Sequence, residues 1–154
     1  MIQFFNVSKT YNGDIPALQG VTLKIDKGEF VFVTGKSGAG KTTLLRLIFR
    51  AELPTNGVIL VNNFNIARLQ RQSIPFLRRN IGVVFQDFKL LPRKTVFENV
   101  GFALQVIGTP RRKINKRVMQ VLQFIGLKDK RDKFPYRLSG GEQQRVAIAR
   151  AIVN

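Results

Sequence analysis

The stretch Gly35-Lys36-Ser37-Gly38-Ala39-Gly40-Lys41-Thr42 decides the fold of this chain. Its glycines let successive backbone N–H groups point inward without interference from Cβ atoms, so that the loop forms a nest for anionic oxygens. Lys41 adds a cation that can reach the β- and γ-phosphates, and the hydroxyl of Thr42 can coordinate Mg²⁺. The sequence therefore predicts a phosphate-binding loop over Gly35–Thr42, with Thr43 beside it in the same binding site.

The segments on either side of the loop are those that such a loop requires. Glu29–Thr34 is a continuous run of apolar and β-branched residues, which predicts a strand buried on both faces within a parallel sheet. Lys41–Arg50 predicts a helix whose positive N-terminal end also attracts phosphate. Its inward-facing side chains are expected to be Leu44, Leu45, Leu47 and Ile48. The loop is therefore predicted to be a P-loop between a core strand and a helix.

Before and after this region the pattern predicts further strands. Alternating apolar residues predict strands with one buried face at Ile2–Val7 and Val21–Ile25, joined through the turn-forming Asn12-Gly13-Asp14 and Pro16. Another strand is predicted at Gly57–Val61. A continuous apolar run predicts a second core strand at Ile81–Phe85. The first part of the chain is therefore expected to be α/β.

Helical periodicity dominates the second part of the chain. It predicts helices at Thr95–Ile107, Arg111–Ile125 and Gly141–Val153, whereas the tendency over Ile66–Arg79 is weaker. Gly126 is placed to end the second of these helices. One face of that helix carries the apolar side chains Ile114, Val118, Val121, Leu122 and Ile125.

Composition indicates a globular chain with an unusual charge. Of its 154 residues, 44% are hydrophobic and 23% are charged, and there is no cysteine or histidine, which excludes disulfides, thiolate metal sites and histidine catalysis. No signal peptide pattern is visible, and no apolar run reaches the roughly 18 residues of a membrane span. The net charge of +17 favours an acidic partner such as nucleotide, nucleic acid or anionic lipid. The alternative is that the basic residues only solvate exposed helices.

A second motif, Leu138-Ser139-Gly140-Gly141-Glu142-Gln143-Gln144-Arg145, precedes the last predicted helix. A serine and two glycines at a helix N-terminus form a site for anionic oxygens, through the helix dipole and free backbone N–H groups. Ser139-x-x-Glu142 also fits an ordinary capping box, which needs no ligand. The motif gains its functional meaning from standing behind a P-loop.

This pairing of motifs resembles the ABC ATPase family, and the likeness extends from Ile2 to Asn154. The resemblance implies that Ser139, Gly140 and Gly141 form the signature loop, which closes over ATP held by another subunit in a head-to-tail homodimer. It implies that Gln86 is the glutamine that reaches Mg²⁺ and the attacking water. It also implies that Tyr11 stacks on adenine, although a tyrosine at a strand end can equally be structural. ATP and Mg²⁺ are the cofactors that the family uses.

The resemblance also implies an organisation. Residues 1–86 would form the nucleotide-binding core, with an antiparallel β-subdomain beside a parallel core sheet. Residues 87–137 would form the helical subdomain that docks onto transmembrane partners, and residues 138–154 the signature loop with its helix. All three belong to a single, partial ABC ATPase domain.

Val84–Pro92 and Thr95–Val100 narrow the resemblance to a branch of the family that acts in bacterial cell division. Members of this branch work with a transmembrane protein at the cytoplasmic face of the inner membrane. Lipoprotein-release and efflux ATPases share the skeleton but differ around Phe88–Pro92. ATPases of the SMC type handle DNA, but they insert a long coiled coil between the glutamine and the signature. The interval here is short, which argues against nucleic acid as the partner.

Two parts of the family pattern have no counterpart among these residues. One is the Walker B strand, with an aspartate for Mg²⁺ and a glutamate that polarises water, and the other is a histidine that contacts the γ-phosphate. We therefore expect residues 1–154 to hold the phosphate cradle, to hydrolyse ATP very slowly and to form an incomplete sheet with open edges. We also expect the chain to be a truncated or partial product of a longer ATPase.

Basic residues concentrate between residues 87 and 137. They far outnumber the acidic residues of that section, which are Asp87, Glu98, Asp129 and Asp132. This section gives a further hypothesis, namely contact with anionic lipid headgroups beside the membrane partner.

Overall fold

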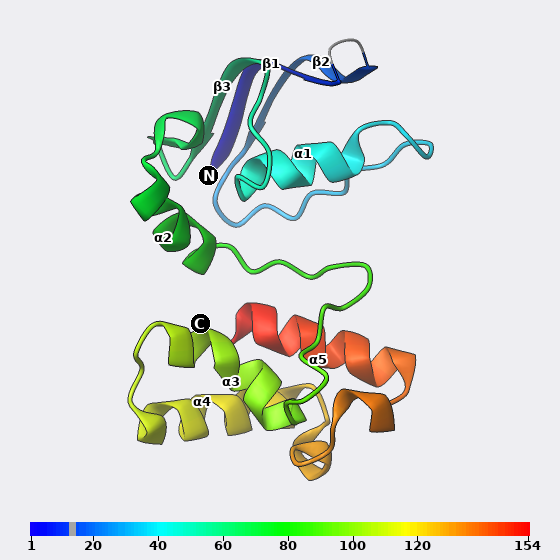
Figure 1. Ribbon diagram of the computed structural model, residues 1–154, viewed down its shortest axis with the longest axis vertical. Helices are drawn as coiled ribbons and strands as arrows, with labels where there is room; N and C mark the ends of the chain where they lie inside the picture. Colours follow the sequence, from blue (N-terminus) through cyan, green and yellow to red (C-terminus); the bar gives the residue numbers. More distant parts are fainter. Residues whose placement is uncertain (13–14) are drawn as a thin grey trace. The chain divides into compact units, whose positions relative to one another are not determined.

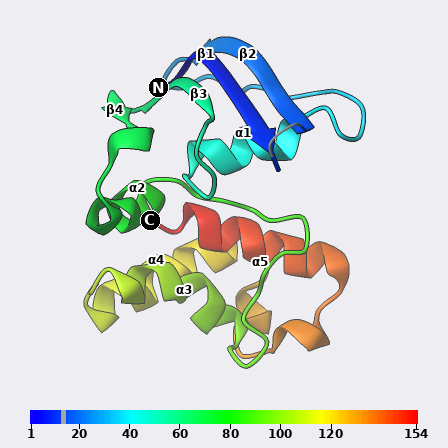
Figure 2. The ribbon, with the colours of Figure 1, turned by 45° about the horizontal axis from the view of Figure 1, so that its top comes forward.

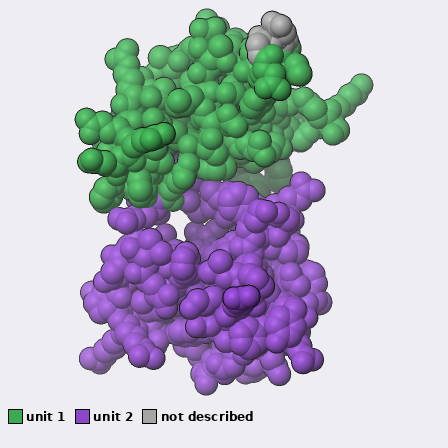
Figure 3. Space-filling view, in the orientation of Figure 1, with its two compact units in different colours: residues 1–78 green, residues 79–154 purple. Residues whose placement is uncertain are grey.

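The computed structural model describes residues 1–12 and 15–154, and it divides the chain into two compact units. Unit 1 is Met1–Arg78 and unit 2 is Arg79–Asn154, shown in different colours in Figure 3. The expected turn at Asn12-Gly13-Asp14 falls partly outside the described residues. Pro16, expected in the same connection, instead lies in the strand Ile15–Ile25 and pairs with Thr10. Asn12 itself is described and has a positive φ of 47°, a conformation that asparagine tolerates better than most residues.

Unit 1 is built on a four-stranded antiparallel sheet in the order β2-β1-β3-β4 (Figure 2). The strands are β1 (Ile2–Tyr11), β2 (Ile15–Ile25), β3 (Asn56–Val61) and β4 (Phe64–Asn65). The three predicted strands of this sheet are confirmed, and the first two extend further than predicted. One face of the sheet lies in the core, where the fully buried side chains are Phe4, Val7 and Ile59. Strict alternation would place Phe4 and Val7 on opposite faces, but the register of β1 shifts between them, where Asn6 has a positive φ of 47°.

Helix α1 (Lys41–Ile48) packs against β2 and β3 in unit 1, and Figure 1 shows it lying along one face of the sheet. Leu44, Leu47 and Ile48 are buried, as predicted. The prediction for Leu45 was wrong, because this side chain is 53% exposed. A step of about 100° per residue turns position 45 away from the stripe formed by positions 44, 47 and 48.

The weak helical tendency over Ile66–Arg79 resolves into three short elements. Two are single 3₁₀ turns, at Ile66–Arg68 and Arg71–Ser73, and the third is helix α2 (Ile74–Arg79).

The structure corrects two predictions, the core strands at Glu29–Thr34 and Ile81–Phe85. Neither segment belongs to a strand among the described residues, and no parallel pair of strands is described. Phe30 and Phe32 are 86% and 79% exposed, although the sequence predicted them to be buried. An apolar run becomes a strand only where a neighbour completes its hydrogen-bond ladder, and within the described residues neither run has such a neighbour.

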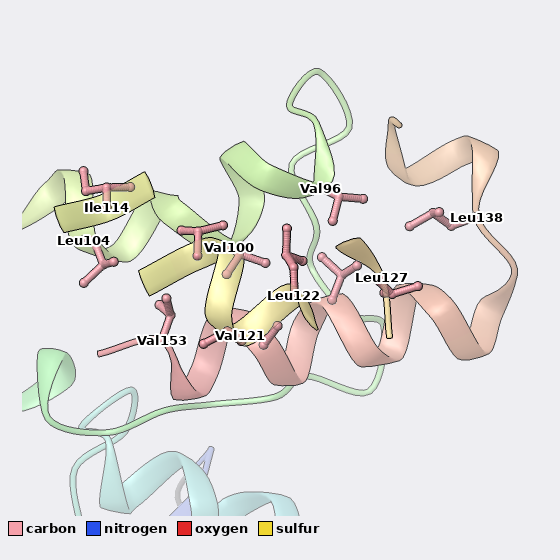
Figure 4. Packing of buried hydrophobic residues seen from close by; sticks show 12 residues of the cluster. Val96, Val100, Leu104, Ile114, Val121, Leu122, Leu127, Leu138 and Val153 are labelled. Carbon is pink, nitrogen blue, oxygen red and sulfur yellow. The ribbon is translucent and has the colours of Figure 1, made fainter. Parts of the chain in front are cut away.

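Unit 2 is a layer of three helices, α3 (Val96–Val106), α4 (Arg111–Phe124) and α5 (Gly140–Ile152). These three predictions are confirmed to within a residue or two at each end. Two single 3₁₀ turns, Lys128–Lys130 and Pro135–Arg137, connect α4 to α5. One apolar cluster joins the helices, and Figure 4 shows Val100, Leu122 and Val153 among its members. Gly126 follows α4 with a φ of 69°, which explains why the helix ends there.

A single buried amide fixes the segment that leads into α3. Asn99 is fully buried, and its Oδ1 accepts from the N–H of Leu91 at 2.7 Å. Its Nδ2 donates to the carbonyl oxygens of Leu91, Lys94 and Thr95, at 3.1, 2.9 and 2.9 Å. The loop before α3 is therefore held to the helix by the hydrogen bonds of one buried side chain. Thr95 and Glu98 complete the attachment as a reciprocal capping box.

We expect Asn99→Ala to lower the free energy of unfolding by about 2–3 kcal/mol, because it removes a buried side chain and leaves the N–H of Leu91 and the carbonyl oxygen of Lys94 without the partner they have here. Chemical denaturation followed by circular dichroism measures this loss. Asn115→Ala, at an exposed position of α4, is the matched control and should change stability by less than about 0.5 kcal/mol. Equal losses in the two variants would contradict this account of Asn99.

Candidate functional site

The predicted P-loop follows irregular backbone and ends where α1 begins. Gly40 is the N-cap of α1, with a left-handed φ of 82°. A Cβ atom at this position would lie 2.3 Å from the carbonyl oxygen of Ala17 and 2.8 Å from the side chain of Leu18. Gly40 is therefore required both by its backbone conformation and by the close packing of the loop on β2. Gly38 also has a positive φ, of 83°, but faces open space.

Lys41 folds back over its own loop. Its Nζ donates to the carbonyl oxygens of Gly35 and Lys36, each at 2.7 Å. The loop residues from Gly35 to Ala39 are exposed, so their backbone is accessible to a ligand. The ammonium group therefore lies at an open glycine-rich loop, where an anion with several oxygens can meet both the cation and backbone N–H groups.

The two threonines after Lys41 occupy different environments. Thr42 is exposed in the first turn of α1, whereas Thr43 is 9% exposed on the buried face of the helix. The hydroxyl of Thr42 is accessible to a ligand, and Thr43 is packed towards the interior of unit 1.

Tyr11 is the last residue of β1, in the same unit as the P-loop. The Nζ of Lys9 lies 4.8 Å from the centroid of its ring, so a cation already covers one face of the ring. Lys9 is held there by a salt bridge of 3.2 Å to Glu52. The hydroxyl of Tyr11 is buried without a hydrogen-bond partner. Only the second ring face is therefore left for stacking on a base.

The signature residues lie at the N-terminus of α5 in unit 2. Ser139 is the N-cap, its Oγ accepts from the N–H of Glu142 at 3.4 Å, and its own N–H donates to the Glu142 carboxylate at 2.9 Å. The capping box that the sequence allowed is therefore formed. A Cβ atom added at Gly140 or Gly141 would meet nothing within 4 Å, so this helix end faces open space.

Glu142 is the acidic centre of this capping box. Lys130 donates a hydrogen bond to its carboxylate, and the backbone N–H of Ser139 donates a second. Both bonds favour the ionised carboxylate and hold the pKa of Glu142 below its ordinary value, against the opposing effect of burial.

Gln86 lies in a turn of unit 2 and is exposed. The N–H of Phe88 donates to the carbonyl oxygen of Phe85 at 3.0 Å, and Asp87 pairs with Lys89 at 2.6 Å. The structure places Gln86 and Ser139 in unit 2, and Lys41 and Tyr11 in unit 1. The predicted site residues are therefore divided between the two units.

Two residues that the sequence analysis missed support the loop around Gln86. One is Asn99, and the other is Arg150, whose guanidinium donates to two carbonyl oxygens of that loop. Both have a signal in the sequence, because each is a polar residue on the apolar stripe of its helix. Asn99 stands beside Val100, and Arg150 lies one turn after the buried Val146.

A glycine-rich loop closed by a lysine, together with a capped Ser-Gly-Gly helix start, defines an ATP-binding cassette of the ABC type. The chain belongs to the ABC transporter family, since the model of that family matches residues 18–154. The described part of the chain contains no helix with both the length and the apolarity to span a bilayer.

Within that family the chain is similar to cell division ATP-binding proteins named FtsE. It is 56% identical to the Bacillus subtilis protein over 154 residues, which is all of this chain and 68% of the relative. It is 51% identical to the Escherichia coli protein, of which it covers 69%. The predicted resemblance to the cell-division branch is therefore confirmed.

Solved structures agree with this assignment. A dimeric ATP-binding cassette in a post-hydrolysis state, bound to ADP and Pi, is 40% identical with a TM-score of 0.90, over all of this chain and 70% of the other. A component of an ABC transporter complex from Clostridium perfringens is 33% identical with a TM-score of 0.89, over 99% of this chain and 61% of the other. The predicted ABC ATPase type of fold is confirmed.

We expect Lys130→Met to raise the pKa of Glu142 towards its ordinary value, because the largest cause of the lowered pKa is removed. A carboxyl group with a lowered pKa in the folded state stabilises the fold above its unfolded pKa, and this contribution is lost as the pH falls through the folded pKa. The start of α5 should therefore loosen in acid, and at higher pH in the variant. NMR titration of the Glu142 carboxyl group measures the midpoint.

Lys128→Met is the matched control, since Lys128 is exposed in the same 3₁₀ turn, and it should leave the midpoint unchanged. A Glu142 midpoint that is the same in Lys130→Met as in the unsubstituted chain would contradict the assignment.

Proposed function

We propose that the chain binds ATP with Mg²⁺ as the nucleotide-binding subunit of a membrane-associated ABC complex in bacterial cell division. The observation that carries the proposal is the position of Lys41, whose ammonium group lies over the exposed glycine-rich loop at 2.7 Å from two of its carbonyl oxygens. Phosphate oxygens can replace those carbonyls as partners of Nζ, at the positive end of α1. The similarity to FtsE proteins supports the setting in cell division.

Each predicted site residue has a role in this proposal. Lys41 and the backbone N–H groups of the loop hold the β- and γ-phosphates, and Thr42 offers its hydroxyl to Mg²⁺. The uncovered ring face of Tyr11 stacks on the base. Gln86 orients towards Mg²⁺ and the attacking water. Mg²⁺, when bound, neutralises charge on the phosphate oxygens.

We also propose that two copies assemble head to tail across ATP. Ser139, Gly140 and Gly141 of one copy then close over nucleotide held by Lys41 of the partner subunit. Both glycines are exposed, and a Cβ atom added at either would meet nothing within 4 Å, which supports this arrangement because it leaves room for a phosphate beside this helix N-terminus. A solved relative with a TM-score of 0.90 is itself a dimeric cassette.

The proposed partner in the membrane is a transmembrane protein of the FtsX type, and the chain lies at the cytoplasmic face of the inner membrane. Residues 1–86 then serve as the nucleotide-binding core, residues 87–137 as the docking subdomain and residues 138–154 as the signature segment. A lipoprotein-release or efflux complex is the alternative setting. Affinity isolation from membranes, with an FtsX-type or a lipoprotein-release protein as the outcome, separates the two.

We expect Lys41→Ala to weaken ATP binding at least about tenfold, equivalent to about 1.4 kcal/mol, because the cation at the phosphates is removed. Isothermal titration calorimetry with the full chain measures the affinity. Lys27→Ala removes an exposed lysine outside the loop and should leave the affinity within about twofold. Unchanged affinity in Lys41→Ala would reject the P-loop assignment.

Helix α4 supports an anionic lipid surface as a further partner. It carries five basic residues and no acidic residue, namely Arg111, Arg112, Lys113, Lys116 and Arg117. The first four are exposed and take part in none of the salt bridges among the described residues. Arg117 instead donates to the carbonyl oxygen of Val153 at 3.0 Å. Each exposed cation that reaches an anionic membrane contributes about 1 kcal/mol.

We expect the quadruple variant R111Q/R112Q/K113Q/K116Q to lose most co-sedimentation with vesicles of phosphatidylcholine and phosphatidylglycerol, because α4 supplies the attraction. A matched variant, K27Q/R46Q/R68Q/R71Q, removes the same charge outside residues 87–137 and should retain binding. Binding of the unsubstituted chain should fall with salt and with removal of the anionic lipid. Equal losses in both variants, or binding that ignores lipid charge, would reject the surface.

A further inference from the structure

Helix α5 carries a predicted site residue at one end and supports another at its opposite end. Ser139 caps its N-terminus, and Arg150 lies in its last turn. At 1.5 Å per residue the two positions are about 16 Å apart along one rigid element. Both ends belong to unit 2, which also contains Gln86.

The segment around Gln86 is fastened along the C-terminal end of α5 on both sides of the glutamine. After it, Nη1 of Arg150 donates to the carbonyl oxygen of Lys89 at 2.6 Å, and Nη2 donates to that of Phe88 at 2.7 Å. Before it, a Cβ atom at Gly82 would lie 2.3 Å from the carbonyl oxygen of Ala151, so the backbones touch there. Gln86 is therefore carried between two points of attachment to the same helix.

The backbone next to Gln86 has a conformation that needs such support. Phe88 and Lys89 are consecutive residues with positive φ, of 58° and 46°, which non-glycine side chains rarely adopt. Such pairs persist only where their surroundings hold them. The two carbonyl oxygens that Arg150 binds belong to these two residues, and burial of the guanidinium lowers its pKa from the ordinary value. A single planar group thus holds both unusual peptide units.

We propose that Arg150 is a positioning residue, which fixes the loop of Gln86 to the signature helix so that glutamine and signature move as one body. Its functional consequence rests on the proposed role of Gln86 at Mg²⁺. Without Arg150, Phe88 and Lys89 relax towards ordinary backbone angles, and Gln86, two residues away, leaves its position. The P-loop lies in unit 1 and keeps its own contacts.

A simpler role for Arg150 is that of a cation at the C-terminal end of the α5 dipole. The two roles differ for lysine. Arg150→Lys keeps the charge, which is all that the dipole needs, but its single ammonium group cannot reproduce the planar fork that meets two carbonyl oxygens. The positioning role therefore predicts that lysine fails where a dipole role predicts that it suffices.

The test measures two quantities on the full chain, hydrogen–deuterium exchange of residues 83–91 and the gain in ATP affinity on adding Mg²⁺ to an EDTA-treated sample. In Arg150→Met and Arg150→Lys we expect faster exchange confined to residues 83–91, and a loss of about tenfold in the Mg²⁺-dependent gain. Affinity in EDTA should stay within about twofold, since the P-loop is unaffected. Arg93→Met, an exposed arginine of the same unit, should change neither quantity.

Gln86→Ala separates this inference from the proposed function. If Gln86→Ala leaves the Mg²⁺-dependent gain intact, Gln86 does not act at Mg²⁺ and that part of the proposed function is wrong. Hydrogen–deuterium exchange at residues 83–91 then decides by itself whether Arg150 holds the loop. If Gln86→Ala removes the gain and the double variant with Arg150→Met loses no more, the two residues act through one another. Unchanged exchange at residues 83–91 in Arg150→Met, or an Arg150→Lys variant identical to the unsubstituted chain, would overturn the proposal. Exchange that rises throughout unit 2 would likewise show that Arg150 only stabilises the fold.

Discussion

The close approach of the glycine-rich loop to β2 is the constraint on which unit 1 depends. Gly40 meets the carbonyl oxygen of Ala17 at a distance that excludes any side chain, and α1 begins at the next residue. This contact sets where the helix starts, and so where Lys41 stands relative to the loop it covers. The chemistry of the site thus follows from a packing constraint, because the same glycine ends the loop, caps the helix and lies on the sheet.

In unit 2, helix α5 both forms part of the apolar core and carries polar groups at its two ends. Its buried face joins α3 and α4 through Val146, Ala149 and Val153, while its two ends are polar. The N-terminus presents Ser139 and two unobstructed glycines, and the C-terminal turn holds the carbonyl oxygens of Phe88 and Lys89 through Arg150. Because a helix is stiff, two loops far apart in sequence are kept in a fixed relation within this unit.

Most of the fold could be predicted from the sequence, because local patterns determine it. The spacing of Ile114, Val118, Val121 and Leu122 predicted the buried face of α4, and Thr95-x-x-Glu98 forms the kind of cap that a sequence can reveal. The predictions of strands at Glu29–Thr34 and Ile81–Phe85 were wrong, because a strand needs a neighbouring strand to pair with, and a local sequence pattern does not show whether one is present. The prediction that Leu45 is buried was wrong, because an apolar residue next to the buried stripe of a helix can itself lie outside that stripe.

The sequence predicts some residues of the candidate site directly, whereas the role of others can be seen only in the folded chain. The P-loop and the signature are contiguous, so their residues could be found directly. Arg150 binds backbone carbonyls 61 and 62 residues away, whereas those that Asn99 binds are four to eight residues before it. In both cases only the folded chain shows which carbonyl oxygens the side chain meets. Likewise, nothing in the sequence indicated that Lys9 covers one face of the Tyr11 ring, which limits how that ring can meet a base.

The central claim is that Gly35–Thr42 binds the phosphates of ATP. Backbone amide NMR of the full chain during titration with ATP and Mg²⁺ tests this claim most directly. The account predicts that the largest shifts fall on the amides of Gly35–Thr42, as Lys41 exchanges its carbonyl partners for phosphate oxygens. Saturable ATP binding with the largest shifts elsewhere, and none in this loop, would contradict it.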